Sequence, residues 1–167
     1  QFSTQDVPNA ENDLGRIAIT MAMKFNEQHR LGLTPTGEPG QDFFNLPAGK
    51  AFGQSGNSAG SSIAMSFVDA SKLMASDYEV AAIDDGAGGV AYQVTRLSDG
   101  KTFDPVAGPT LSVDGLEIQV AGAVGDRFTV KPYREAAANI SVALKRPDQI
   151  AAAGAFEAKL PNNNTGS

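Results

Sequence analysis

"TLSVDGLEIQV", residues 110–120, contains the clearest local signal of structure in the chain. Apolar residues alternate with polar ones on both sides of the dipeptide Asp114-Gly115. Alternation with a period of two is typical of a strand with one buried face, and an Asp-Gly pair favours a tight two-residue turn. The stretch therefore predicts a β-hairpin whose turn consists of Asp114 and Gly115.

The same period of two recurs along the chain on both sides of this hairpin. The further segments that show it are 63–67, 78–82, 90–97, 126–132 and 139–145. Eighteen glycines and nine prolines supply turns for short connections. We therefore predict an antiparallel β domain of about six or seven strands, with one helical turn in the sequence "REAAAN" (134–139).

Residues 13–31 precede the β segments and follow the period of a helix instead. Asn12 or Asp13 is predicted to cap its start, and Gly32 to end it in a left-handed conformation. Two apolar strips are visible, Leu14-Ile17-Ala18-Met21-Phe25 and Ile19-Met23. Two strips exceed what one β domain is expected to cover, so we expect the second strip to pack against helices outside that domain.

The fold class predicted from these patterns is α+β, mainly β. One long helix precedes the antiparallel domain, and the sequence "DQIAAAG" (148–154) predicts a short helix near the C-terminus, ended by Gly154.

Composition excludes several classes of partner and site. The chain has 167 residues, a net charge of −6 and a pI near 4.7, whereas surfaces for nucleic acid or anionic membranes need clustered Lys and Arg. It has no Cys, which excludes disulfides and thiolate metal sites. No apolar run approaches the roughly 20 residues that span a bilayer. The first residues lack Met and the features of a signal peptide, so we expect a piece of a longer protein.

No arrangement of residues typical of catalysis is visible. His29 is the only histidine, and it has no metal-ligating residue at a suitable spacing. We interpret it as an exposed residue in the last helical turn, and the sequence 84–86 as a β-turn and not a calcium loop. The serines of 55–62 lie in Gly-Ser sequence, and 86–89 lacks the spacing of a phosphate loop. We therefore predict no enzyme, no cofactor and no metal.

A binding module is the competing class of function. The loops 84–89 and 104–109, with Tyr78, Tyr92 or Tyr133, suggest a surface for a glycan or a host protein. We therefore keep an extracellular adhesive β module as the alternative hypothesis.

Several stretches together resemble one known family. The sequence "FNEQHRLGLTPTGEPGQDFF" (25–44) is similar to the junction after the inner helix in flagellar hook-associated protein 1, the FlgK family. The residues that match this junction are Asn26, His29, Gly32, Gly37, Gly40, Phe43 and Phe44. The stretches 69–80, 92–103, 114–144 and 147–153 also resemble that family, in the same order.

The resemblance implies a division of the chain and a function. It implies an inner helical stem and joint at 1–45, an outer β domain at 46–146, and a short helix with a return segment toward the stem at 147–167. His29, Gly32, Gly37, Gly40, Phe43 and Phe44 would form the structural joint.

The terminal helical regions of the family are missing from this sequence, so the chain resembles a middle fragment. The function implied is structural, at the junction between hook and filament of the bacterial flagellum. The implied partners are other copies, hook protein and the next hook-associated protein. The implied location is extracellular, after export by the flagellar type III route.

Overall fold

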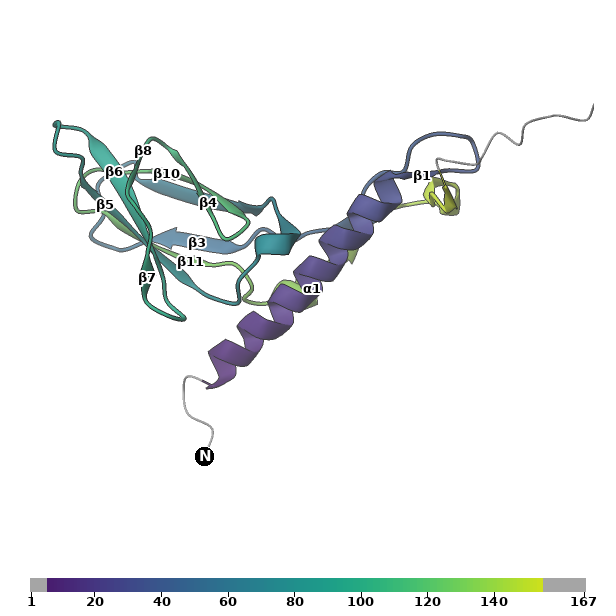
Figure 1. Cartoon of the computed structure of the whole chain (residues 1–167), viewed down its shortest axis with the longest axis horizontal. Coiled ribbons are helices and arrows are strands. Elements are labelled where there is room, and N and C mark those ends of the chain that lie inside the picture. The colour runs from purple at the N-terminus through teal and green to yellow at the C-terminus, as the bar shows by residue number, and fades with distance from the viewer. Residues whose placement is uncertain (1–5, 155–167) are drawn as a thin grey trace, which may run out of the picture. The chain divides into compact units, whose positions relative to one another are not determined.

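The computed structural model of the chain describes residues 6–154 and is drawn in Figure 1. Within this range lie one long helix, sheets of three and six strands, and two ladders of two strands each. Every strand pair among these residues is antiparallel. The arrangement confirms the predicted α+β, mainly β class.

Two compact units make up the described residues. The β unit contains the chain up to Met23 and Leu46–Ile140, and the small unit contains Lys24–Asn45 and the chain from Ser141. The long helix α1 (Asp6–Arg30) contributes residues to both. The boundary between Asn45 and Leu46 lies where the sequence placed it. The β unit also includes α1 up to Met23, because Ile19 and Met23 pack in its core, and it ends at Ile140 where 146 was expected.

The β unit contains two sheets. The three-stranded sheet has the order β4 (Ser62–Phe67), β10 (Leu116–Ala121) and β9 (Thr110–Val113). The six-stranded sheet has the order β3 (Lys50–Gly53), β11 (Arg127–Lys131), β5 (Tyr78–Asp84), β6 (Val90–Arg96) and β7 (Lys101–Thr102), with β8 (Val106–Ala107) also paired to β6. Short helical turns lie at η1 (Ala70–Lys72) and α2 (Ala136–Asn139).

Six predicted strands correspond to β4, β5, β6, β9, β10 and β11, and the helical turn after β11 is also confirmed. In the β unit the structure adds the strands β3, β7 and β8, which carry no alternating apolar pattern. The seventh prediction, 139–145, was too long: only Ser141–Val142 form a strand, and they belong to the small unit.

Apolar side chains from both sheets form one core. Ile118 of β10 lies opposite Met65 of β4 and Leu111 of β9, and all three are buried. Val80 and Phe128 form a buried pair between β5 and β11 of the other sheet. Alternate residues point inward as the pleat requires, which is why the period of two predicted these strands well.

Helix α1 buries the strip that the sequence analysis expected to lie outside the domain. Ile19 is 0% exposed and Met23 8% exposed, and both belong to the core of the β unit. Leu14, Ile17 and Met21 of the first strip are exposed instead. The two strips lie on opposite sides of the helix because 3.6 residues make one turn. The assignment of Ile19 and Met23 to an outside partner was therefore wrong.

The ends of α1 also differ from the prediction. The helix begins at Asp6, so Asn12 lies inside it, where its side chain is buried. It ends at Arg30, and Gly32 lies in the following strand without a positive φ. Neither the predicted cap nor the left-handed glycine terminus is present.

Short ladders organise the small unit. Strand β1 (Gly32–Leu33) pairs with β13 (Ala153–Gly154), and β2 (Phe44–Asn45) pairs with β12 (Ser141–Val142). The predicted C-terminal helix is reduced to one 3-10 turn, η2 (Pro147–Gln149). The remaining residues up to Gly154 run extended, because Ala153 and Gly154 pair with β1. Across residues 6–154, no helix is both long enough and apolar enough to span a membrane.

Candidate functional site

The small unit contains all six predicted joint residues. His29 is 5% exposed, and its two ring nitrogens have different backbone partners. The Nδ1 atom lies 2.5 Å from the carbonyl oxygen of Gln41, and the amide of Ala151 donates to Nε2 over 2.9 Å. The expectation of an exposed histidine was therefore wrong, because its partners come from segments that are distant in sequence.

Asn26 lies one turn before His29 on the same buried face of α1. Its side chain is 3% exposed. The Oδ1 atom accepts hydrogen bonds from the amides of Phe43 and Phe44 at 2.9 and 2.8 Å, and Nδ2 donates to the carbonyl oxygen of Phe44 at 2.9 Å. One side chain thus satisfies three backbone groups of the chain that leads into β2.

Aromatic rings surround these polar groups. The ring of Phe25 meets the rings of Phe43 and Phe44 edge to face, with centroids 4.9 and 5.4 Å apart, and Phe43 and Phe44 are 4.9 Å from each other. The His29 ring lies 5.5 Å from Phe43 in the same geometry. Edge-to-face contacts of this kind add stability beyond the area they bury.

Two glycines permit a close approach of the backbone to His29 and Ala151. A Cβ atom at Gly32 would lie 2.4 Å from the carbonyl oxygen of Ala151, and one at Gly40 would lie 1.9 Å from that of His29. Gly37 differs, since it has φ +83° and no atom within 4 Å of its missing Cβ. The structure therefore places Gly32 and Gly40 beside His29, whereas Gly37 serves a turn.

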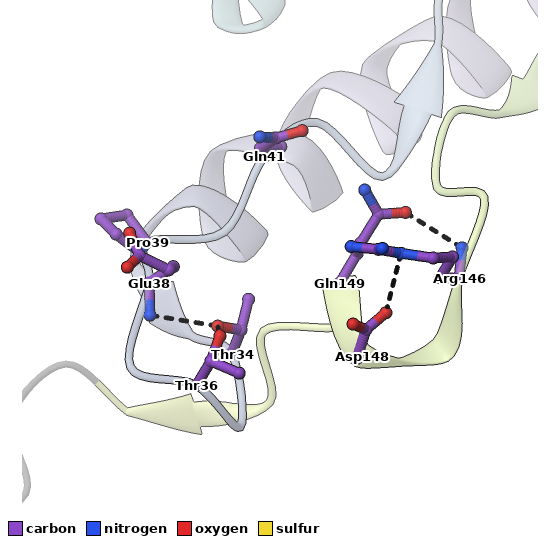
Figure 2. A pocket seen from close by; sticks show the side chains of 8 residues that line it. All are labelled: Thr34, Thr36, Glu38, Pro39, Gln41, Arg146, Asp148 and Gln149. Carbon is purple, nitrogen blue, oxygen red and sulfur yellow. Dashed lines mark hydrogen bonds and ion pairs between the residues drawn. The ribbon is translucent and has the colours of Figure 1, made fainter.

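A shallow polar cavity of about 160 Å³ lies in the small unit, and Figure 2 shows its lining. The lining residues are Thr34, Thr36, Glu38, Pro39, Gln41, Arg146, Asp148 and Gln149. The amide of Glu38 donates to Thr34 on one side, and Arg146 pairs with Asp148 on the other, at 3.2 Å. Among these lining residues, no nucleophilic side chain is hydrogen-bonded to a general base.

The predicted hairpin turn lies in the β unit, between β9 and β10. Asp114 has φ 47° and Gly115 has φ 76°, as expected for a two-residue turn of this kind. A Cβ at Gly115 would lie 2.2 Å from the carbonyl oxygen of Asp69. The turn therefore requires glycine both for its conformation and for its packing.

Two side chains that were not among the predicted turn residues, Tyr78 and Arg96, stabilise this turn. Asp114 accepts hydrogen bonds from the Tyr78 hydroxyl at 2.9 Å and from Nη1 of Arg96 at 2.9 and 3.1 Å. Arg96 also donates to Asp99, which lowers the pKa of Asp99 to about 2. Burial, and then the bond to Asp114, raises the pKa of Tyr78. Tyr78 and Arg96 lie 36 and 18 residues from Asp114, too far in sequence for a local pattern to reveal these bonds.

The tyrosines proposed for a glycan surface are buried. Tyr92 is 6% exposed, and its hydroxyl bonds with the backbone of Gly122. Tyr133 is 1% exposed and Tyr78 is 0% exposed. None of the three rings can stack on a sugar from these positions, so that part of the adhesive hypothesis was wrong. Among residues 6–154, no cluster of His, Cys, Asp or Glu has the geometry to hold a metal ion.

Comparisons with known proteins place this geometry in context. The family model described as "Flagellar hook-associated protein 1, D2-like domain" matches residues 52–132. The model described as "Flagellar hook-associated protein FlgK helical domain" matches residues 1–44. The two matches fall on the β segment and on the helix with its joint, in the order that the resemblance predicted.

Individual relatives agree with these models. The chain is 34% identical to flagellar hook-associated protein 1 of Escherichia coli (strain K12) and 33% identical to that of Salmonella typhimurium (strain LT2), in each case over 99% of the chain and 30% of the relative. The solved structure of the flagellar hook junction protein FlgK from Burkholderia pseudomallei has a TM-score of 0.73 at 30% identity. That match covers 87% of the chain and 27% of the solved protein. The chain thus spans less than a third of these relatives.

Proposed function

Because the chain belongs to the flagellar hook-associated protein 1 family, we propose that it is a structural part of the bacterial flagellum, at the junction between hook and filament. The observation that carries the proposal is the similarity to the Escherichia coli relative over 99% of the chain. The work done there is mechanical: a packed β unit is held on a helix, and no step of catalysis is involved.

Helix α1 supports a stem role through the exposed residues of its first apolar strip. Leu14, Ile17 and Met21 form an outward stripe, with exposed fractions of 61%, 48% and 67%. The model that matches residues 1–44 describes a helical domain, yet α1 is the one long helix in residues 6–154. Further helices of the longer protein would cover the outward stripe, since burying each such side chain is worth roughly 1.5–3 kcal/mol. Residues 1–45 then act as stem and joint, 46–146 as the outer domain, and 147–167 as the return segment.

The joint role belongs to His29, Gly32, Gly37, Gly40, Phe43 and Phe44. The buried hydrogen bonds of Asn26 and His29 support it, because they fix the backbone as it leaves the helix. A junction protein transmits force between its stem and its outer domain, and a rigid exit from the helix suits that task.

The partners follow from the same proposal. They are other copies of the chain, the hook protein and the next hook-associated protein of the axial structure. The protein reaches this place outside the cell by the flagellar type III export route. The absence of cysteine is compatible with export as an unfolded chain.

A chimera tests the function. The matching segment of the Escherichia coli relative is replaced by this chain, and the chimera is expressed in a strain that lacks the relative. We expect swimming and filament attachment to be restored. A chimera that carries Leu14→Glu and Met21→Glu on the outward stripe should be exported but should not restore attachment. If the unmodified chimera is exported and folded but filaments still do not attach, the proposal is wrong.

A further inference from the structure

The hydrogen bonds of His29 define the position of its proton. A backbone amide can only donate, so Nε2, which meets the amide of Ala151, must be without hydrogen. A carbonyl oxygen can only accept, so Nδ1, which meets the oxygen of Gln41, must carry the hydrogen. The buried ring is therefore the neutral Nδ1–H tautomer, held by two backbone segments.

A second proton on this ring would break the contact with Ala151. Protonated Nε2 is a donor, and it would face the donating amide of Ala151. The ring would also carry a charge in a site that is 5% exposed to solvent. Both effects favour opening of the contact, because a buried charge needs a partner of opposite charge.

The charged groups on the elements around His29 do not compensate for that charge. On α1, Lys24 pairs with Glu27, and Arg30 pairs with Asp42 of the segment before β2. After β12, Arg146 pairs with Asp148. These six side chains are about half exposed or more, and Glu38 and Lys145 on the same segments are also exposed. The hydrogen bonds of the two ring nitrogens go to backbone atoms and not to any of these charged groups.

Ala151 lies at a point where several contacts of the small unit meet. It is 9% exposed and precedes β13, which pairs with β1. The missing Cβ positions of Gly32 and Gly40 both face it, at 2.4 Å from its carbonyl oxygen and 2.6 Å from its Cβ. Loss of the bond to His29 would therefore free the amide of Ala151 and weaken the contacts of the residues that lead into β13.

We infer that His29 is a proton-sensitive latch, which holds residues 147–154 against the end of α1 when the ring is neutral and loosens that hold when the ring is protonated. Imidazole is the side chain that ordinarily changes its charge between about pH 5 and 8. Other buried hydrogen bonds of the small unit, such as those of Asn26, involve no group that titrates in this range.

Nuclear magnetic resonance tests the latch directly, since His29 is the only histidine of the chain. Long-range ¹⁵N spectra report the tautomer and the protonation of the ring, and hydrogen exchange reports the Ala151 amide. We expect the Nδ1–H tautomer at about pH 8. As the ring titrates, the protection factor of Ala151 should fall by up to about tenfold per pH unit, as one linked proton requires. The amides of Val80 and Phe128 in the β unit should stay protected.

His29→Gln is the matched variant, because its Oε1 can accept from Ala151 at every pH. In this variant any protection of Ala151 should be independent of pH over the same range. An Nε2–H tautomer in the parent protein, or a protonated ring with Ala151 still protected, would overturn the inference. Loss of protection at the same pH in the Gln variant would do so as well, because carboxylates would then be the cause.

Discussion

Helix α1 is held in two different ways along its length. In the β unit it buries apolar side chains, Ile19 and Met23, in a shared core. In the small unit its buried face is polar, and Asn26 and His29 bind the backbone through hydrogen bonds. Apolar burial depends mainly on area, whereas a buried polar group stabilises only when its partners are correctly placed. The first kind of contact therefore resists small shifts, and the second kind fixes geometry.

The largest effect should come from charges in the apolar part of the helix. Ile19→Glu with Met23→Glu buries two carboxylates without partners, which should cost more than about 4 kcal/mol and unfold the β unit. Circular dichroism and urea denaturation measure this. Leu14→Glu with Met21→Glu adds the same charges to the outward stripe and should leave the melting temperature nearly unchanged. Equal effects of the two pairs would contradict the assignment of faces.

The hairpin turn tests how far geometry matters inside the β unit. Gly115→Val places a branched side chain at φ 76° and against the carbonyl oxygen of Asp69, and should cost at least about 3 kcal/mol. Gly86→Val is the control, because Gly86 has φ 79° and no atom within 4 Å of its missing Cβ. It should cost only about 1–2 kcal/mol. Urea midpoints that agree within error would show that the close contact is unimportant.

Removal of the Asn26 side chain, which binds the backbone of Phe43 and Phe44, should affect the small unit alone. Asn26→Ala leaves the amides of Phe43 and Phe44 without their acceptor, at a cost of about 1–3 kcal/mol. Hydrogen exchange should show faster exchange of these two amides, while amides of β5 and β11 keep their protection. The exposed neighbour Gln28 provides a control, since Gln28→Ala should change stability by less than about 0.5 kcal/mol. If the amides of Phe43 and Phe44 exchanged at the same rate in both variants, the hydrogen bonds of Asn26 would not stabilise this segment.

The smallest effect concerns the hydrogen-bonded carboxylate of Asp126 within the β unit. Asp126 accepts hydrogen bonds from the hydroxyl and amide of Ser58 and from the amide of Ala123, which hold its pKa below the ordinary value. A lowered pKa in the folded state contributes stability above the unfolded value of about 3.9, and this contribution is lost as the pH falls through the folded value. The urea concentration at the unfolding midpoint should therefore decrease as the pH is lowered from about 5 to about 2.

Asp126→Asn should lower the urea midpoint at neutral pH and make the midpoint less dependent on acid. Asp104→Asn, at an exposed position, is the control and should keep the parent slope. If Asp126→Asn kept the parent dependence of the urea midpoint on pH, other carboxylates would cause the acid sensitivity.

The strands and the hairpin could be predicted because their signals are local. In β9 and β10 every second side chain is buried, and the dipeptide Asp114-Gly115 between them has the composition of a two-residue turn. The short strands β3, β7 and β8 could not be predicted in this way. They are defined by pairing with β11 and β6, and their own residues are largely exposed.

The polar face of α1 was the main error, and its cause is physical. Asn12 was expected to cap the helix and His29 to be exposed, whereas both are buried. The partners of His29 lie 12 and 122 residues away along the chain, so no local pattern could show that it is buried. The resemblance to a family indicated that Asn26 and His29 belong together, but it could not say what they bind.

The pairing of β2 with β12 has a consequence for how such a protein can change in evolution. Asn45 and Ser141 are register partners in this ladder, so the chain leaves the small unit and re-enters it at neighbouring positions. Residues 46–140 are thus inserted like a cassette between two adjacent strands. A recombination event at this point could lengthen, shorten or exchange the cassette while every hydrogen bond of the β2–β12 ladder remained in place. Sequence divergence is therefore expected to be tolerated more readily inside the cassette than at its two ends.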